Sequence, residues 1–166
     1  MADALDFVEI DNFGLATVLA RKGNGAAEIG NALGAEVAVG PRFIPGSTTL
    51  LGCGPGHWLA FTERSEPGWH QAVAGMLKGL ASVSDQSSGY VVHRLSGPAA
   101  RQVLQRGAPV DLDPSVFGPG MVATTVIAHI TVTIWQVDDA PTYFIAFFRS
   151  YARSLRHWVE LTAAAL

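Results

Sequence analysis

The sequence is poor in charged side chains. Only 15% of its 166 residues are Asp, Glu, Lys or Arg, and 49% are hydrophobic, whereas soluble domains usually have about 25% charged residues. So few charges cannot cover the surface of a small monomer. We therefore expect an apolar surface that meets a partner, either another chain or a second copy of this one in a homodimer. The alternative is a compact, weakly charged monomer.

Other absences exclude whole classes of protein. The net charge is −3 and the one basic cluster is Arg149, Arg153 and Arg156, which argues against nucleic-acid binding. We expect Arg153 and Arg156 near a C-terminal helix, where the helix dipole favours positive charge. No segment approaches the roughly 18 apolar residues of a membrane span, and the N-terminus lacks the pattern of a secretion signal. Cys53 is the single cysteine, which excludes an internal disulfide and predicts a reducing, cytoplasmic setting.

What is present is a blurred internal repeat. Ala26-Ala27 and Gly34-Ala35 recur 73 positions later as Ala99-Ala100 and Gly107-Ala108. The alternative is chance similarity in a chain rich in Ala and Gly. In the second copy we expect Ser96 to cap a short helix and Gly107 to end it. Residues 1–6 are expected to be frayed.

Each half of the sequence has the same predicted order of elements: strand, helix, extended return, hairpin, helix. In the first half these are residues 13–20, 26–33, 36–39, a hairpin of 47–52 and 57–62, and a helix beginning at Glu66-Pro67. The apolar positions of that last helix form a stripe of Trp69, Val73, Met76, Leu77 and Leu80.

The second half begins after a polar seam, Ser82–Ser88. Its predicted strands are residues 90–95, a hairpin of 121–127 and 130–137 around Ala128-His129, and 142–148 after a turn at 138–141. A long loop at 111–120 should run over the surface. The last helix repeats the apolar stripe as Tyr151, Leu155, Trp158, Val159 and Thr162.

These patterns predict an α+β fold. A single unit has too little apolar cover for both faces of its sheet, so we expect two similar strand-helix-hairpin-helix halves whose mostly antiparallel sheets pack together, with the helices outside. The expected organisation is one domain, residues 1–166, built from two pseudo-repeats at about 7–81 and 82–166.

The sequence contains few patterns that are typical of catalytic or binding sites. Gly52–Gly56 has the glycines of a phosphate loop but lacks its Gly-Lys-Ser/Thr and is flanked by strands, so a turn is the better interpretation. No two of the five histidines (His57, His70, His93, His129 and His157) stand at metal-ligand spacing. Several side chains have a possible chemical role, but a structural role is the better interpretation of each. The chemical alternatives are a nucleophile at Cys53, a base at His70 or His157, an acid–base pair at Asp138-Asp139 and a functional carboxylate at Asp85, for which a cap is the structural role. We therefore predict no catalytic, cofactor-binding or metal-binding residue in this chain.

The four tryptophans occupy equivalent places in the two halves. Trp58 and Trp135 fall on hairpin strands, and Trp69 and Trp158 fall on the final helices. Core symmetry explains this placement most simply. The alternative, an aromatic cage for a quaternary amine, requires the rings to line one exposed pocket.

A set of short motifs runs through both halves of the sequence. They are Leu51-Gly52, Gly54-Pro55, Trp58-Leu59, Leu95-Ser96-Gly97-Pro98, Ala100, Val103-Leu104, Gly107, Asp111-Leu112, Pro114, Phe117, Gly120, Asp139-Ala140-Pro141-Thr142-Tyr143, Arg149-Ser150, Ala152, Leu155 and Trp158. With these motifs the sequence resembles a known family, the gamma subunit of heterotetrameric sarcosine oxidase, which is related to the folate-binding aminomethyltransferase fold. The resemblance covers about residues 35–161, and the second half is its specific part.

The resemblance implies a four-subunit enzyme that oxidises sarcosine to glycine, passes the methyl carbon to tetrahydrofolate and forms hydrogen peroxide. It places flavin (FAD and FMN) and NAD on the alpha and beta subunits and zinc on the delta subunit. It gives the gamma subunit no cofactor and a structural role of packing against alpha. Tyr90-Val91-Val92-His93 stands where the family has a more aliphatic strand, which leaves open a sister enzyme for another N-methylated amino acid. A stand-alone folate or one-carbon binding protein is the alternative from a different class.

Overall fold

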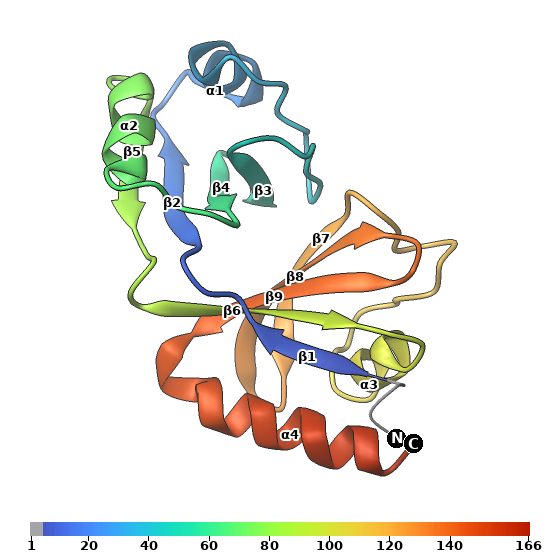
Figure 1. Cartoon of the computed structure of the whole chain (residues 1–166). Helices are drawn as coiled ribbons and strands as arrows, with labels where there is room; N and C mark the ends of the chain where they lie inside the picture. Colours follow the sequence, from blue (N-terminus) through green and yellow to red (C-terminus); the bar gives the residue numbers. More distant parts are fainter. Residues whose placement is uncertain (1–4) are drawn as a thin grey trace. The chain divides into compact units, whose positions relative to one another are not determined.

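The computed structural model describes residues 5–166, and the chain in it forms two compact units (Figure 1). The N-half unit is Asp11–Ser88, and the C-half unit joins residues 5–10 to Gly89–Leu166. Each unit contains one antiparallel sheet and its own helices. The α+β class expected from the sequence is confirmed.

The sheet of the N-half unit has four strands in the order β3-β4-β2-β5. These are β2 (Gly14–Ala20), β3 (Thr49–Gly54), β4 (His57–Thr62) and β5 (Ala81–Asp85). Helices α1 (Ala26–Leu33) and α2 (Trp69–Met76) cover the side of the sheet on which Ala16, Val18, Trp58 and Ala60 alternate. Ile29 of α1 and Val73 of α2 are buried against this side.

The sheet of the C-half unit has five strands in the order β1-β6-β9-β8-β7. They are β1 (Asp6–Glu9), β6 (Tyr90–Ser96), β7 (Val122–Ile127), β8 (Ile130–Asp138) and β9 (Thr142–Phe148). Helix α3 (Ala100–Gln105), the 3-10 turn η1 (Arg149–Tyr151) and helix α4 (Ala152–Ala164) complete the unit. Its core joins one sheet face, with Ile134, Ile145 and Phe147, to Leu104 of α3 and Leu155 of α4.

Both predicted hairpins are confirmed. The turn between β7 and β8 holds Ala128 and His129 at φ 49° and 67°, as expected for a two-residue turn whose twist matches the strands. Asp138 Oδ1 accepts the N–H groups of Ala140 and Thr142 at 3.0 and 2.8 Å. The carboxylate therefore closes the predicted turn before β9.

The strands next to the unit boundaries were not predicted. The supposed polar seam contains β5, which pairs with β2, and Asp6 begins β1, which pairs with β6 of the C-half unit. Serines alternate with Ala81 and Val83 along β5, so the polar composition hid an edge strand with one apolar side. Of the residues expected to be frayed, 1–4 lie outside the described part. The extended segment expected at 36–39 is an irregular loop.

Several expected helix signals are wrong. Ser96 ends β6, and Ala99 is the N-cap of α3 without a side-chain hydrogen bond. Helix α2 begins at Trp69, later than the expected start at Glu66-Pro67, and it ends at Met76. Met76 is 47% exposed and does not belong to the buried stripe. Arg153 lies in the first turn of α4 and Arg156 in the second, with no basic residue in the last turn. The dipole therefore disfavours their charge.

Gly107 does not end α3 by a left-handed conformation; its φ is not positive. A Cβ at this position would collide with the ring of Trp158 on α4. The residue is small because α4 passes close by. In the loop 111–120, Leu112 and Phe117 are 0% and 3% exposed, so this loop contributes to the core instead of only crossing the surface.

No helix in residues 5–166 has the length and apolar character needed to cross a membrane; the longest, α4, has 13 residues.

Candidate functional site

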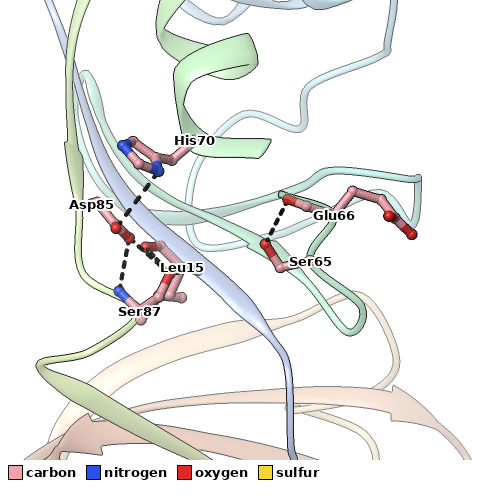
Figure 2. Close-up of polar contacts among 6 residues, drawn as sticks. All are labelled: Leu15, Ser65, Glu66, His70, Asp85 and Ser87. Atoms are coloured by element: carbon pink, nitrogen blue, oxygen red, sulfur yellow. Dashed lines mark hydrogen bonds and ion pairs between the residues drawn. The ribbon is translucent and has the colours of Figure 1, made fainter. Parts of the chain in front are cut away.

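The best-connected polar cluster in the N-half unit joins the start of α2 to the end of β5 (Figure 2). His70 Nδ1 lies 3.6 Å from Asp85 Oδ2. Ser87 donates its hydroxyl to Asp85 Oδ1 at 2.7 Å and its backbone N–H to the same oxygen at 3.0 Å. The Ser87 hydroxyl also accepts the backbone N–H of Leu15 at 3.0 Å. Beside the cluster, Ser65 Oγ lies 3.4 Å from the carbonyl of Glu66.

This cluster has the residue types of a nucleophilic triad but a different order of contacts. In a triad the histidine stands between the serine and the carboxylate and accepts the serine proton. Here the carboxylate of Asp85 lies in the middle and contacts both His70 and Ser87, so His70 is not placed to accept the proton of Ser87. The arrangement instead ties the end of β5 to β2, which fits the capping role considered for Asp85.

The electrostatics of Asp85 agree with this structural role. Burial raises the pKa of its carboxyl, but the two hydrogen bonds from Ser87, together with the positive charge that His70 can carry, outweigh burial and hold the pKa below its usual value. A depressed pKa makes the carboxylate a weaker base, so it is unsuited to proton abstraction near neutral pH.

A second cluster surrounds His93 in the C-half unit. The imidazole is fully buried and stacks between Phe7 of β1 and Phe147 of β9, with ring centroids 4.3 and 5.4 Å away. Arg156 donates from Nη2 to His93 Nε2 at 3.2 Å, and Glu9 lies 3.8 Å from the same nitrogen. Burial, with the nearby guanidinium of Arg156, lowers the pKa of His93 to about 4.

The neutral His93 therefore acts as an acceptor that holds α4 to the sheet. Since Nε2 accepts from Arg156, the ring proton lies on Nδ1, which is enclosed and has no hydrogen-bond partner in the described residues. The sequence could not show this cluster, because 63 positions separate His93 from Arg156.

The other residues considered for chemistry are dispersed. Cys53 lies at a register shift between β3 and β4, with Sγ 3.5 Å from the carbonyl of Leu51. His129 is in the β7–β8 turn, and His157 is exposed on α4. Asp138 closes its turn, and Asp139 is exposed beside it. Among residues 5–166, no three His, Cys, Asp or Glu side chains gather closely enough to hold a metal ion.

The tryptophans do not line a common exposed pocket. Trp58 and Trp135 are 5% and 1% exposed, and Trp135 stacks on Phe144 with ring centroids 5.4 Å apart. Trp69 donates from Nε1 to Thr48 Oγ1 at 3.0 Å. Trp158 packs partly buried against the core of its own unit. These positions support the interpretation that the rings belong to the cores.

Comparison with known proteins identifies the family of the chain. A family model described as "Sarcosine oxidase, gamma subunit family" matches residues 20–165. The sarcosine oxidase gamma subunit of Corynebacterium sp. (strain P-1) is 31% identical over 134 residues, covering 81% of this chain and 65% of that protein. The corresponding subunit from Corynebacterium sp. (strain U-96) is 31% identical over 150 residues, covering 88% of this chain and 71% of that protein. The match to the first of these relatives thus spans slightly less than two thirds of its length.

Solved structures agree with the sequence match. A chain of heterotetrameric sarcosine oxidase from Corynebacterium sp. U-96, solved with pyrrole 2-carboxylate, superposes with a TM-score of 0.87 at 26% identity, covering 99% of this chain and 86% of that one. Aminomethyltransferase T of the glycine cleavage system from Bartonella henselae shares the fold, with a TM-score of 0.67 at 15% identity over 94% of this chain and 45% of that one. The chain belongs to the sarcosine oxidase gamma subunit family.

Proposed function

We propose that this chain is the non-catalytic gamma subunit of a sarcosine oxidase complex and packs against the alpha subunit. The complex would demethylate sarcosine oxidatively to glycine, transfer the methyl carbon to tetrahydrofolate and form hydrogen peroxide. The observation that carries the proposal is the match over 99% of the chain to a chain of a heterotetrameric sarcosine oxidase.

The contacts of the polar side chains support a structural role. Asp85 and Ser87 tie two strands together, Asp138 closes a turn, and His93 accepts from Arg156. Each of these groups already has a local partner whose loss would destabilise the unit. None of them combines a free nucleophile with a neighbouring base, which acyl or proton transfer would require.

The cofactors of such a complex would lie on its other subunits. We propose FAD, FMN and NAD on alpha and beta, zinc on delta, and tetrahydrofolate as the acceptor of the methyl carbon. A cytoplasmic location and homodimers of the isolated chain remain predictions from composition.

A test of the structural role needs the assembled complex. We expect His70→Gln and His157→Gln to leave kcat and KM for sarcosine unchanged, because neither imidazole would touch substrate. A drop of about 100-fold in kcat for either variant, in a complex of unchanged mass, would show that this chain takes part in the chemistry and would overturn the proposal.

Two alternatives remain to be separated from this proposal. A sister enzyme for another N-methylated amino acid would oxidise that substrate in preference to sarcosine in a direct comparison of kcat/KM. A stand-alone folate-binding protein is supported by the fold it shares with aminomethyltransferase T. That alternative predicts a change in tryptophan fluorescence when the isolated chain is titrated with tetrahydrofolate, whereas the gamma-subunit proposal predicts none.

A further inference from the structure

A hollow of about 520 Å³ opens in the N-half unit between the start of α1, the loop 38–41 and the β3–β4 hairpin. Its volume lies within the roughly 300–1,000 Å³ of known small-molecule sites. Its lining residues come from three segments that can be followed in Figure 1: α1, the connection from α1 to β3, and the β3–β4 hairpin. The lining residues are Gly25, Ala26, Ala38, Val39, Gly40, Pro41, Cys53, Gly54, Pro55, Gly56 and Trp58.

The hollow exists because small residues surround it. Helix α1 has only eight residues, and the loop that follows it is held on the edge of β3 by a hydrogen bond from Gly52 N–H to the carbonyl of Arg42 at 3.1 Å. A Cβ on Gly52 would collide with the carbonyl of Gly40, so the loop approaches the strand through backbone alone. No lining side chain other than that of Trp58 is long enough to fill the space between.

The lining carries no charged side chain. Glu28 already supplies a carboxylate at the start of α1, where its Oε2 accepts the N–H of Gly25 at 2.8 Å. This carboxylate offsets the positive end of the helix dipole and disfavours a second anion at the hollow. Burying a cation in an apolar hollow is also costly without a paired charge. The site therefore favours an uncharged molecule.

Trp58 supplies the polar donor of the lining through its indole Nε1–H. The residue is 5% exposed, but this N–H is not one of the enclosed atoms without a partner, which in the described residues are His93 Nδ1 and Gln136 Oε1. Water therefore reaches it, whereas Trp69 Nε1 donates to Thr48. Because a largely buried indole favours a hydrogen-bond acceptor, an oxygen atom of a bound molecule would replace that water.

We propose that this hollow binds a small, uncharged molecule that has an apolar ring and a carbonyl or ether oxygen, with the oxygen accepting the Nε1–H of Trp58. The apolar ring would contact Val39, Pro41 and Pro55, and would displace water from their side chains. This site goes beyond the proposed function and does not depend on assembly with other subunits.

Benzamide is a suitable probe, because it joins a phenyl ring to a neutral carbonyl. The full chain labelled with ¹⁵N has four indole N–H signals, one for each tryptophan, and the Trp58→Phe variant identifies that of Trp58. We expect benzamide to shift the Trp58 signal in a saturable way and to slow the alkylation of Cys53, the single thiol of the chain. Benzoate, the charged analogue, should bind at least ten-fold more weakly.

Two variants distinguish binding in the hollow from non-specific binding elsewhere on the chain. Ala38→Phe should fill the hollow and abolish the benzamide response, whereas Ala72→Phe, on an alanine outside the lining, should leave it unchanged. Trp58→Phe keeps a ring in the core but removes the donor, so protection of Cys53 should require about five-fold more benzamide, the factor expected for one hydrogen bond.

Three results would overturn the proposal. One is the absence of any saturable change at Trp58 or Cys53 up to the solubility of benzamide, while Ala38→Phe and the parent chain are both folded by circular dichroism. Another is equal binding of benzamide and benzoate. The third is protection of Cys53 only inside an assembled complex, which would assign the hollow to a side chain of another subunit.

Discussion

The close approach of α4 to the end of α3 gives a sharp prediction at Gly107. In the Gly107→Ala variant the new methyl group would meet Trp158 Cη2 at 2.7 Å and Ile127 Cγ2 at 3.1 Å. Real Cβ atoms essentially never approach another atom as closely as 2.7 Å, and 3.1 Å is tighter than most contacts of a Cβ, so either the indole ring must leave its position or α4 must move. The substitution therefore tests whether Gly107 is small because of packing.

The expected cost follows from two opposing effects. Overpacking a core by a methyl group usually costs about 1–3 kcal/mol. Because the φ of Gly107 is not positive, alanine also gains about 0.4–1 kcal/mol by restricting the unfolded chain. We expect a net loss of roughly 1–2 kcal/mol in the free energy of unfolding. For a protein of this size that corresponds to a fall of about 2–8 °C in Tm.

Urea unfolding followed by far-ultraviolet circular dichroism would measure this loss. Gly118→Ala is the matched control in the same unit, because its new methyl group would lie 3.9 Å from the nearest heavy atom, the carbonyl oxygen of Pro114, and its stability should be unchanged or slightly raised. In the Trp158→Leu background, adding Gly107→Ala should cost at most half of what it costs in the parent chain, because the large ring is gone. If Gly107→Ala is as stable as Gly118→Ala, the packing argument is wrong.

Three further predictions concern other elements. The pKa of His93 is lowered from 6.5 to about 4, so between these pH values the unfolded chain binds a proton that the folded chain does not. The free energy of unfolding should therefore fall by about 2–3 kcal/mol as the pH decreases through this window. His93→Gln should flatten the pH profile measured by urea unfolding, and parallel profiles of variant and parent would contradict this. Ser87→Ala removes the side-chain contacts to Asp85 and to the N–H of Leu15, and should lower the free energy of unfolding by about 1–2 kcal/mol. The amide hydrogen of Leu15 should then exchange faster, and exchange at the parent rate would contradict the role of Ser87 in joining β5 to β2. Replacing Ala128-His129 by Asn-Gly should raise stability by about 1 kcal/mol, because both positions have positive φ and this pair favours such turns; a lower Tm would refute it.

Sequence patterns predicted the elements that depend on local signals. Alternating apolar residues and a short turn define the β7–β8 hairpin, and Asp138 with Pro141 marks the next turn. The helix α1 was predicted with its observed ends, and the structure places Gly34 after it in a left-handed conformation. Each of these signals lies within a few residues of the structure that it specifies.

The parts that failed depend on contacts between distant residues. β5 is an edge strand whose serines look like a linker, and only its pairing with β2 makes it a strand. A glycine at position 107 is typical of the end of a helix, but its small size is required by the ring of Trp158, 51 positions away. The partner of His93 is likewise on α4. Local propensity cannot show such tertiary contacts.

The same distinction applies to the candidate site. Asp85 was considered as a cap from the sequence, and its carboxylate accepts the N–H of Ser87 two residues later. The absence of a metal site stays a prediction. The sequence did not show the hollow beside Cys53, because glycine and proline in a turn are also typical of an ordinary loop. The hollow depends on how the loop 38–41 approaches β3, which is fixed only in the folded chain.

Native mass spectrometry of this chain, co-expressed with the proposed alpha, beta and delta subunits from the same source, tests the central claim most directly. We expect a particle that contains one copy of this chain for each alpha subunit and that oxidises sarcosine. Recovery of a sarcosine-oxidising particle of alpha, beta and delta alone, with this chain left as a free monomer or dimer, would contradict it.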